Sequence, residues 1–226
     1  SRLFRDPAAW YHMVVAIDTT QSTNTNRVKI YWNGVQETTF NTAQYPDQNE
    51  ELTLGQFSSV TTQLGWFVES GYGLDGYIAE VNYIDGIQQA VTEFGEFDDS
   101  GIWKPKEYTG SYGNEGFYLN FSSAGDMGND SVNNNDFTVK NVNQNDQATD
   151  TPTNNFCTGN ELVNFAPGGQ NLFQGATRFY NPSGQNWQSI TGTFGLTSGK
   201  WYWEFQTDGT GAFVGISDVQ DSIIPQ

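Results

Sequence analysis

Carboxylates at alternate positions are the first residues of this sequence that could do chemistry. A retaining glycosidase uses two carboxyl groups about 5 to 5.5 Å apart, and alternate residues of a strand place such groups on one face. Glu96 and Asp98 have this spacing, but Ser100 stands where a third carboxylate would continue the pattern. Glu80 is followed at the same spacing by an asparagine and an isoleucine, so it stands alone. We therefore expect no catalytic carboxylate pair, and Glu80 is interpreted as an exposed strand residue.

A serine, histidine and aspartate triad is the second chemistry to consider. His12 is the single histidine of the chain, and it lies inside the apolar run from Trp10 to Ile17. A histidine in such a run is expected to have a structural role in or near the core. The sequence therefore predicts a protein that is not an enzyme.

Loop carboxylates could bind a metal ion. Asp and Asn oxygens are hard ligands of the kind that Ca²⁺ prefers. The candidate calcium ligands are Asp98, Asp99, Asp126 and Asp130, with Asp85 and Asn129 as further oxygen donors. The stretch from Asp126 to Asp130 lacks the full alternation and the terminal glutamate of an EF-hand loop, so an ordinary acidic turn is the alternative interpretation. Calcium is the one cofactor that the sequence suggests.

Aromatic residues near loop signals are candidates for glycan binding. Sugars stack on exposed aromatic rings beside polar groups, and aromatic residues make up 15% of the chain. The candidates are Trp66, Tyr72, Trp103, Tyr108 and Tyr112. Trp103 and Tyr108 flank a Lys-Pro-Lys segment that could equally dock on a sheet, and a large aromatic side chain is more often buried than exposed. The sequence leaves glycan binding and core packing open for these residues.

The charge of the chain excludes some classes of partner. The 226 residues include 26 acidic and 9 basic side chains, for a net charge of −17. Nucleic acids are not expected as partners, because binding them depends on clustered Lys and Arg. No run approaches the roughly 18 apolar residues that span a bilayer, so we expect no membrane insertion. Cys157 is the only cysteine, which excludes an intrachain disulfide and a cysteine-based zinc site.

Short strands separated by turn residues dominate the first part of the chain. Trp10 to Ile17 predicts a buried strand, and Arg27 to Trp32 alternates as a half-buried strand does. Asn33-Gly34 follows and predicts a hairpin with a type I′ turn into Val35 to Phe40. Further strands are expected at Glu51 to Gly55, Gln63 to Val68 and Leu74 to Gly86. This spacing indicates an antiparallel sandwich.

The composition changes after residue 86. Val91 to Glu96 could form one helical turn, and Phe117 to Phe121 reads as a short strand after an arm. Ser122 to Asn160 is too poor in apolar residues to form a core of its own. We predict a linker there, either flexible or laid down on a neighbouring surface, with Phe137 and Val139 as anchors.

A second β pattern begins near residue 175. Strands are expected at Thr177 to Tyr180, Gln188 to Phe194, Trp201 to Thr207 and Phe213 to Ser217. In the third of these, the period of two places Trp201, Trp203 and Phe205 on one face. This pattern predicts a second β-sandwich.

Two motifs resemble known families. The segment Leu74-Asp-Gly-Tyr-Ile-Ala-Glu-Val-Asn-Tyr-Ile-Asp-Gly86 resembles the closing strand of a laminin-G-like or concanavalin-A-like jelly roll. The string Ser198-Gly-Lys-Trp-Tyr-Trp-Glu-Phe205, followed by Phe213-Val-Gly-Ile-Ser217, resembles the opening strands of a SPRY-type β-sandwich. The order of short motifs over most of the chain is similar to virion structural proteins of marine tailed bacteriophages. These motifs lie at Arg5–His12, Asp18–Gln21, Tyr31–Val35, Gly76–Asn82, Gly101–Tyr108, Thr151–Asn154 and Ser198–Trp203.

This resemblance implies an all-β chain in three parts. They are a partial antiparallel jelly-roll sandwich at 1–100, an arm and polar extended linker at 101–165, and the start of a second β-sandwich at 166–226. In such proteins further strands precede the first of these and follow the last. The chain is therefore expected to be an interior part of a longer polypeptide.

The resemblance also implies a function. It suggests a non-enzymatic structural protein on the virion surface, as a tail fibre, adhesin or capsid decoration, that binds a host glycan or receptor. The expected partners are other virion proteins and copies of itself in a homo-oligomer. An incomplete sandwich exposes sheet edges, so the edge near the Trp10 strand is expected to pair with a segment outside this chain. The alternatives are a lectin-like carbohydrate-binding module outside any virus and a glycoside hydrolase.

Overall fold

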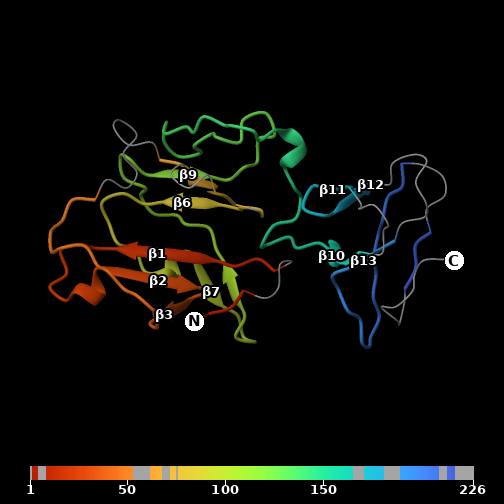
Figure 1. Ribbon diagram of the computed structural model, residues 1–226, viewed down its shortest axis with the longest axis horizontal. Coiled ribbons are helices and arrows are strands. Elements are labelled where there is room, and N and C mark those ends of the chain that lie inside the picture. The colour runs from red at the N-terminus through yellow and green to blue at the C-terminus, as the bar shows by residue number, and fades with distance from the viewer. Residues whose placement is uncertain are drawn as a thin grey trace. The chain divides into compact units, whose positions relative to one another are not determined.

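Antiparallel strands make up nearly all of the regular structure of the chain (Figure 1). The computed structural model describes residues 2–4, 9–52, 62–67, 72–74, 76–164, 171–180, 189–208 and 213–216. Within these ranges the only helices are short 3-10 turns at Asn24–Asn26, Val91–Glu93 and Gln144–Asp146. The all-β prediction is therefore confirmed, and the expected helical turn after residue 90 is a 3-10 turn. No helix in the described ranges is long and apolar enough to cross a membrane.

The chain divides into two compact units. Unit 1 consists of Ser1–Gln147 and Thr151–Asn155, and unit 2 consists of Ala148–Asp150 and Phe156–Gln226. The arm that follows residue 100 therefore belongs to the same unit as the N-terminal strands.

A three-stranded sheet opens unit 1. Strands β1 (Met13–Ile17), β2 (Val28–Trp32) and β3 (Val35–Glu37) lie side by side in that order, all antiparallel (Figure 1). Asn33 and Gly34 join β2 to β3 with φ angles of 46° and 77°. Positive φ at both positions is what a type I′ turn requires, so the predicted hairpin is confirmed.

Strand β1 differs from the buried strand that the sequence predicts. It begins at Met13, and of its five residues only Ala16 is buried, whereas Met13 and Val15 are exposed. Among the described residues β1 pairs with β2 alone, so it is an edge strand. An apolar run on an edge strand is buried only where another element covers it, which explains the difference.

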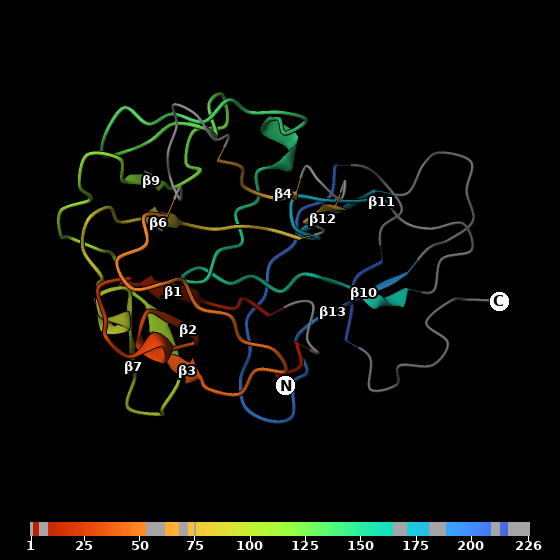
Figure 2. The ribbon, with the colours of Figure 1, turned by 60° about the vertical axis from the view of Figure 1, so that its left-hand side comes forward.

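Three two-stranded ribbons contain the other strands of unit 1 in the part that the structure describes. The pairs are β4 (Trp66–Phe67) with β5 (Tyr72–Gly73), β6 (Val81–Tyr83) with β9 (Phe117–Leu119), and β7 (Gly95–Phe97) with β8 (Trp103–Pro105). In both views β7 lies close to the β1–β2–β3 sheet (Figure 2). The predicted strand at Leu74 to Gly86 is reduced to β6, because Glu80 has a φ of 55° and interrupts the extended backbone. Of the predicted strand at Glu51 to Gly55, residues 51 and 52 are not in a strand and the rest lie outside the described residues.

Aromatic rings from the arm form the core of unit 1. The buried apolar residues of the described part are Ala16, Tyr108, Tyr112, Phe117 and Leu119. The rings of Tyr83 and Phe117 stack at 5.3 Å between centroids, and Phe137 meets Phe117 edge to face at 4.9 Å. Phe137 is therefore an anchor as predicted. Residues 122–147 are laid down on the rest of unit 1, which is one of the two alternatives for the predicted linker.

Unit 2 contains two further ribbons. Strand β10 (Gly159–Asn164) pairs with β13 (Ile190–Gly192), and β11 (Asn171–Phe173) pairs with β12 (Arg178–Tyr180). The predicted strands at Thr177 to Tyr180 and Gln188 to Phe194 thus correspond to β12 and β13, although residues 181–188 lie outside the described part. Residues 201–207 and 213–216 are not in strands, so the two last strand predictions are wrong for them. Apolar residues that alternate with a period of two are compatible with a strand, but a strand also needs a hydrogen-bonded neighbour.

Candidate functional site

The β4–β5 ribbon carries two of the predicted glycan-binding residues in exposed positions. Trp66 is 53% exposed, and Tyr72 is also exposed. Trp66 lies opposite Gly73, and a Cβ atom added to that glycine would lie 3.3 Å from Trp66 Cε3. The indole therefore packs against a bare backbone and stays open to solvent elsewhere. Such a supported, exposed ring is suited to stacking on a sugar.

The register of this ribbon separates Trp66 from Tyr72. Residues directly opposite each other in an antiparallel pair share a face. Trp66 shares a face with the position of Gly73, and Tyr72, which precedes Gly73 on the same strand, faces the other side. Trp66 and Tyr72 therefore point to opposite sides of the ribbon, and they do not form one continuous aromatic platform.

Trp103 is placed in packing contacts instead of at an open surface. Its indole Nε1 donates a hydrogen bond of 2.9 Å to His12 Nδ1, and the two rings stack at 5.9 Å between centroids. Phe97 meets the same indole edge to face at 4.9 Å. Side chains at Gly34 or Gly95 would collide with this ring, so two backbone segments lie directly against it. Of the two alternatives that the sequence leaves open for Trp103, the structure places the residue in packing.

Tyr108 is buried in the aromatic core. Its hydroxyl donates to the Ser111 carbonyl oxygen at 3.0 Å and accepts from Gln89 Nε2 at 3.0 Å. Its ring stacks on Phe94 at 5.1 Å and meets Tyr112 edge to face at 5.1 Å. With hydroxyl and ring both engaged inside unit 1, Tyr108 has no surface left for a sugar.

Tyr112 is also a structural residue. Its hydroxyl donates a hydrogen bond of 2.7 Å to Asn82 Oδ1. Burial, with smaller contributions from neighbouring ionisable groups, raises the pKa of Tyr112 to about 12. The hydroxyl is therefore a permanent donor at ordinary pH, and it fixes the arm to strand β6.

Asp130 holds a loop together with both carboxylate oxygens. Oδ1 accepts from the backbone N–H groups of Tyr118 and Val132 at 2.9 and 3.1 Å. Oδ2 accepts from those of Asn133 and Asn135 at 3.1 Å each. The side chain is only 5% exposed, so these four donors replace its hydration. The geometry is that of a structural carboxylate whose oxygens already face hydrogen-bond donors, which is unsuited to a calcium ligand.

The other predicted calcium ligands are dispersed. Asp98 accepts from the Ser100 and Ile102 backbone N–H groups at 2.9 Å, and Lys104 Nζ lies 2.9 Å from its Oδ2. The hydrogen bond from Lys104, followed by those backbone donors, lowers the pKa of Asp98. Asp99 and Asp126 are exposed. The described part of the chain contains no group of three or more His, Cys, Asp or Glu residues that could hold a metal ion.

The carboxylates weighed as catalytic groups have local partners or irregular backbone. Glu96 is exposed on β7 opposite Lys104, and Asp98 is held by that lysine. Glu80 lies before β6 in a left-handed conformation, so the expected strand face with Asn82 does not include it. Burial lowers the pKa of His12, whose Nδ1 is engaged by Trp103. His12 therefore has the structural role that the sequence predicts.

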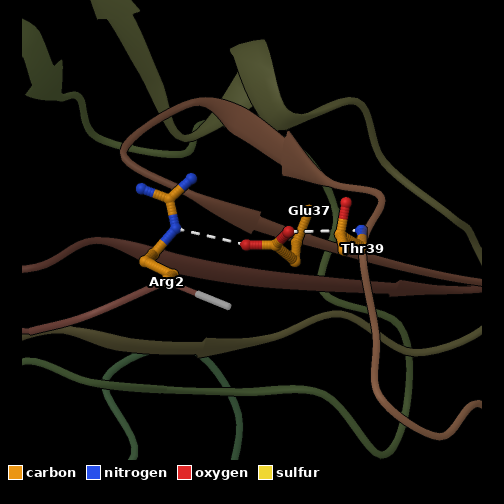
Figure 3. A network of polar contacts seen from close by, with 3 residues as sticks. All are labelled: Arg2, Glu37 and Thr39. Carbon is orange, nitrogen blue, oxygen red and sulfur yellow. Dashed lines mark hydrogen bonds and ion pairs between the residues drawn. The ribbon is translucent and has the colours of Figure 1, made fainter.

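Carboxylates elsewhere in unit 1 also serve as local anchors. At the end of β3, Glu37 accepts from the Thr39 N–H at 3.3 Å and from Arg2 Nε at 3.4 Å (Figure 3). The Thr39 donor, and then Arg2, lower the pKa of Glu37. Asp18 accepts from Thr20 and Gln21, and these bonds lower its pKa. These acidic groups hold turns in place.

Two features of unit 1 were not predicted from the sequence. One is the role of Asp130, for which the signal was available: a carboxylate followed within five residues by several asparagines is typical of a loop built on side-chain to backbone bonds. The other is the pair of glycines against Trp103, which gives no local signal.

Comparison of the chain with protein-family models, with curated proteins and with solved structures finds no match.

Proposed function

We propose that this chain is a non-enzymatic structural protein of a bacteriophage virion that presents its β4–β5 ribbon to a neutral glycan on the host surface. The exposed Trp66, supported by Gly73, carries the proposal. Exposing a large aromatic ring forgoes the hydrophobic gain of burial, and a stacked sugar restores part of it. Tyr72 contributes from the opposite side of the ribbon, as a separate contact.

The proposal that the chain is not an enzyme is supported by the contacts of the side chains that catalysis would need. Asp98 is held by Lys104, and His12 Nδ1 accepts from Trp103. Glu96 is thereby left without a second free carboxylate on its strand. A retaining mechanism needs two such groups facing one bond.

The proposed setting is the particle surface, with other virion proteins or further copies of this chain as partners. The resemblance to marine tailed-phage proteins suggests the particle surface as the setting. The open edge of strand β1 supports an assembly with other virion proteins or with further copies of the chain. An open edge accepts an additional strand through its backbone groups, and Met13 and Val15 on β1 are exposed beside it. The net charge of −17 favours a neutral glycan over an acidic one.

A binding measurement tests the glycan part of the proposal. The probes are the neutral polysaccharides laminarin, mannan and dextran, with the acidic polysaccharide alginate for comparison, in affinity gel electrophoresis. We expect at least one neutral polysaccharide to retard the protein, and Trp66→Ala to weaken that binding tenfold or more, about 1.4 kcal/mol. Tyr180 is the matched control, because it is also an aromatic residue on a ribbon and 53% exposed. Equal losses in Trp66→Ala and Tyr180→Ala, or no retardation by any neutral polysaccharide, would contradict it.

Two further measurements test the setting and the absence of catalysis. Mass spectrometry of purified particles is expected to detect the chain, and its occurrence only as free protein would favour a lectin-like module outside any virus. Incubation with the same polysaccharides is expected to release no reducing ends. Release that disappears in Glu96→Gln would instead establish a glycoside hydrolase.

A further inference from the structure

Unit 2 carries a row of exposed aromatic side chains outside any strand. Trp201, Trp203 and Phe205 are 60%, 46% and 57% exposed. These three residues are called the aromatic row. The rings of Trp203 and Phe205 stack at 5.5 Å between centroids, so these two side chains lie on the same side of the segment.

Local contacts hold the row in place. The indole Nε1 of Trp201 donates a 2.8 Å hydrogen bond to the Ser198 carbonyl oxygen. The planes of Trp203 and Phe205 are inclined by only 25°, so each ring limits the motion of the other. After the row, Asp208 Oδ2 lies 3.7 Å from Arg178 Nη2 on strand β12, which ties this end of the segment to the β11–β12 ribbon. A surface that is already ordered loses less entropy when a ligand binds.

The chemistry of the segment favours a saccharide over a protein strand. Between residues 200 and 207 every apolar side chain is aromatic, and none is aliphatic. Polar groups also occur along the segment: the Tyr202 hydroxyl donates to the Glu204 carboxylate, and both side chains are exposed. Flat, exposed rings match the C–H face of a sugar, whereas aliphatic side chains would favour a protein strand.

The local charges specify the kind of saccharide. Lys200 and Glu204 carry opposite charges within the segment, and so do Arg178 and Asp208 at its end. The row is therefore locally neutral in a chain with a net charge of −17. A neutral saccharide is complementary to such a surface, whereas an acidic one would be repelled by the rest of the protein.

We propose that the aromatic row is a second glycan-binding surface, in unit 2, for neutral polysaccharides. This inference rests on the proposed function, because it assigns the same ligand class to a second place in the chain. Two such surfaces give one polypeptide two contacts with a polymeric ligand, which strengthens attachment where both engage. Each surface also binds by itself, so each can be tested by itself.

The test uses the full chain with the same three neutral polysaccharides. We expect Trp201→Ala and Trp203→Ala each to weaken binding fivefold or more, and Trp201→Phe, which keeps a ring, to weaken it less than Trp201→Ala. In a protein that already carries Trp66→Ala, a further Trp201→Ala is expected to abolish the remaining retardation. Far-UV circular dichroism of each variant checks that unit 2 remains folded.

The outcomes separate this inference from the proposed function. If Trp66→Ala removes all binding and Trp201→Ala changes nothing, the second surface is refuted while the proposed function stands. If the row mediates binding but Trp66 does not, the proposal for the β4–β5 ribbon fails and the inference holds. Sedimentation that shows self-association lost in Trp203→Ala, with polysaccharide binding unchanged, would identify the row as a protein contact and overturn the inference.

Discussion

Replacing Asp130 with asparagine tests whether this residue organises the arm of unit 1. The variant Asp130→Asn keeps the size of the side chain and exchanges one acceptor oxygen for an NH₂ group. Each oxygen of Asp130 accepts two backbone N–H groups, so either orientation of the amide turns two bonds into donor–donor contacts. Hydrogen bonds to a charged group contribute about 1.5 to 3 kcal/mol each. We therefore expect the free energy of unfolding of unit 1 to fall by about 3 kcal/mol or more.

The loss of stability in Asp130→Asn should appear as local opening of the loop as well as in the free energy of global unfolding. Hydrogen exchange by NMR is expected to show faster exchange at the amides of Tyr118, Val132, Asn133 and Asn135, and urea unfolding followed by aromatic fluorescence gives the free energy. Asp126→Asn is the matched control, since Asp126 lies four residues earlier with an exposed side chain, and its effect should stay within about 0.5 kcal/mol. Equal effects of the two substitutions would refute the reasoning. So would a stability that EDTA lowers and Ca²⁺ restores, because Asp130 would then be a calcium ligand.

Four further predictions concern the packing of unit 1. Trp103→Phe removes the hydrogen bond to His12 and part of the ring volume, and thermal unfolding should show a loss of about 1 to 3 kcal/mol. Gly34→Ala and Gly101→Ala share a φ of +77°, but only the first places a methyl group against Trp103, so calorimetry should show a larger loss for Gly34→Ala. Because burial lowers the pKa of His12, stability is complete above pH 6.5 and declines as pH falls through the folded-state pKa; NMR titration of this single histidine checks the direction. Tyr112 should stay protonated until about pH 12, with stability lost as pH rises from the ordinary tyrosine value through that pKa, and absorbance at alkaline pH compared with Tyr112→Phe measures it.

Features set by neighbouring residues were predictable from the sequence. The Asn33-Gly34 turn is an example, because the positive φ values of a two-residue hairpin loop are a property of those two residues. The antiparallel β class follows from many such local signals. Strand β12 and the 3-10 turn at Val91–Glu93 were found in the same way.

Features that depend on distant partners were not predictable. Trp201 to Thr207 alternates as a strand does, but no segment among the described residues pairs with it, so it is not in a strand. Trp66 and Trp103 look alike in the sequence as aromatic residues near loops. Trp66 lies against a ribbon with an open side, whereas Trp103 lies against Gly34 of the β2–β3 turn and Gly95 of strand β7. Contacts between residues far apart in sequence therefore decide which tryptophan remains available for a ligand.

The position of Trp103 has a consequence for how this protein can be divided. The indole occupies the space that Gly34 and Gly95 leave free and is hydrogen-bonded to His12, so the N-terminal strands are completed by a residue that follows them. An expression boundary at residue 100 would leave two glycine backbones facing solvent and a histidine without its donor. Recombination or truncation should therefore conserve the segment through Asn155 as one inherited block, because unit 1 includes Thr151–Asn155. Exchange of modules is better placed at the junction between the two units, where a boundary leaves Trp103 and its neighbours together.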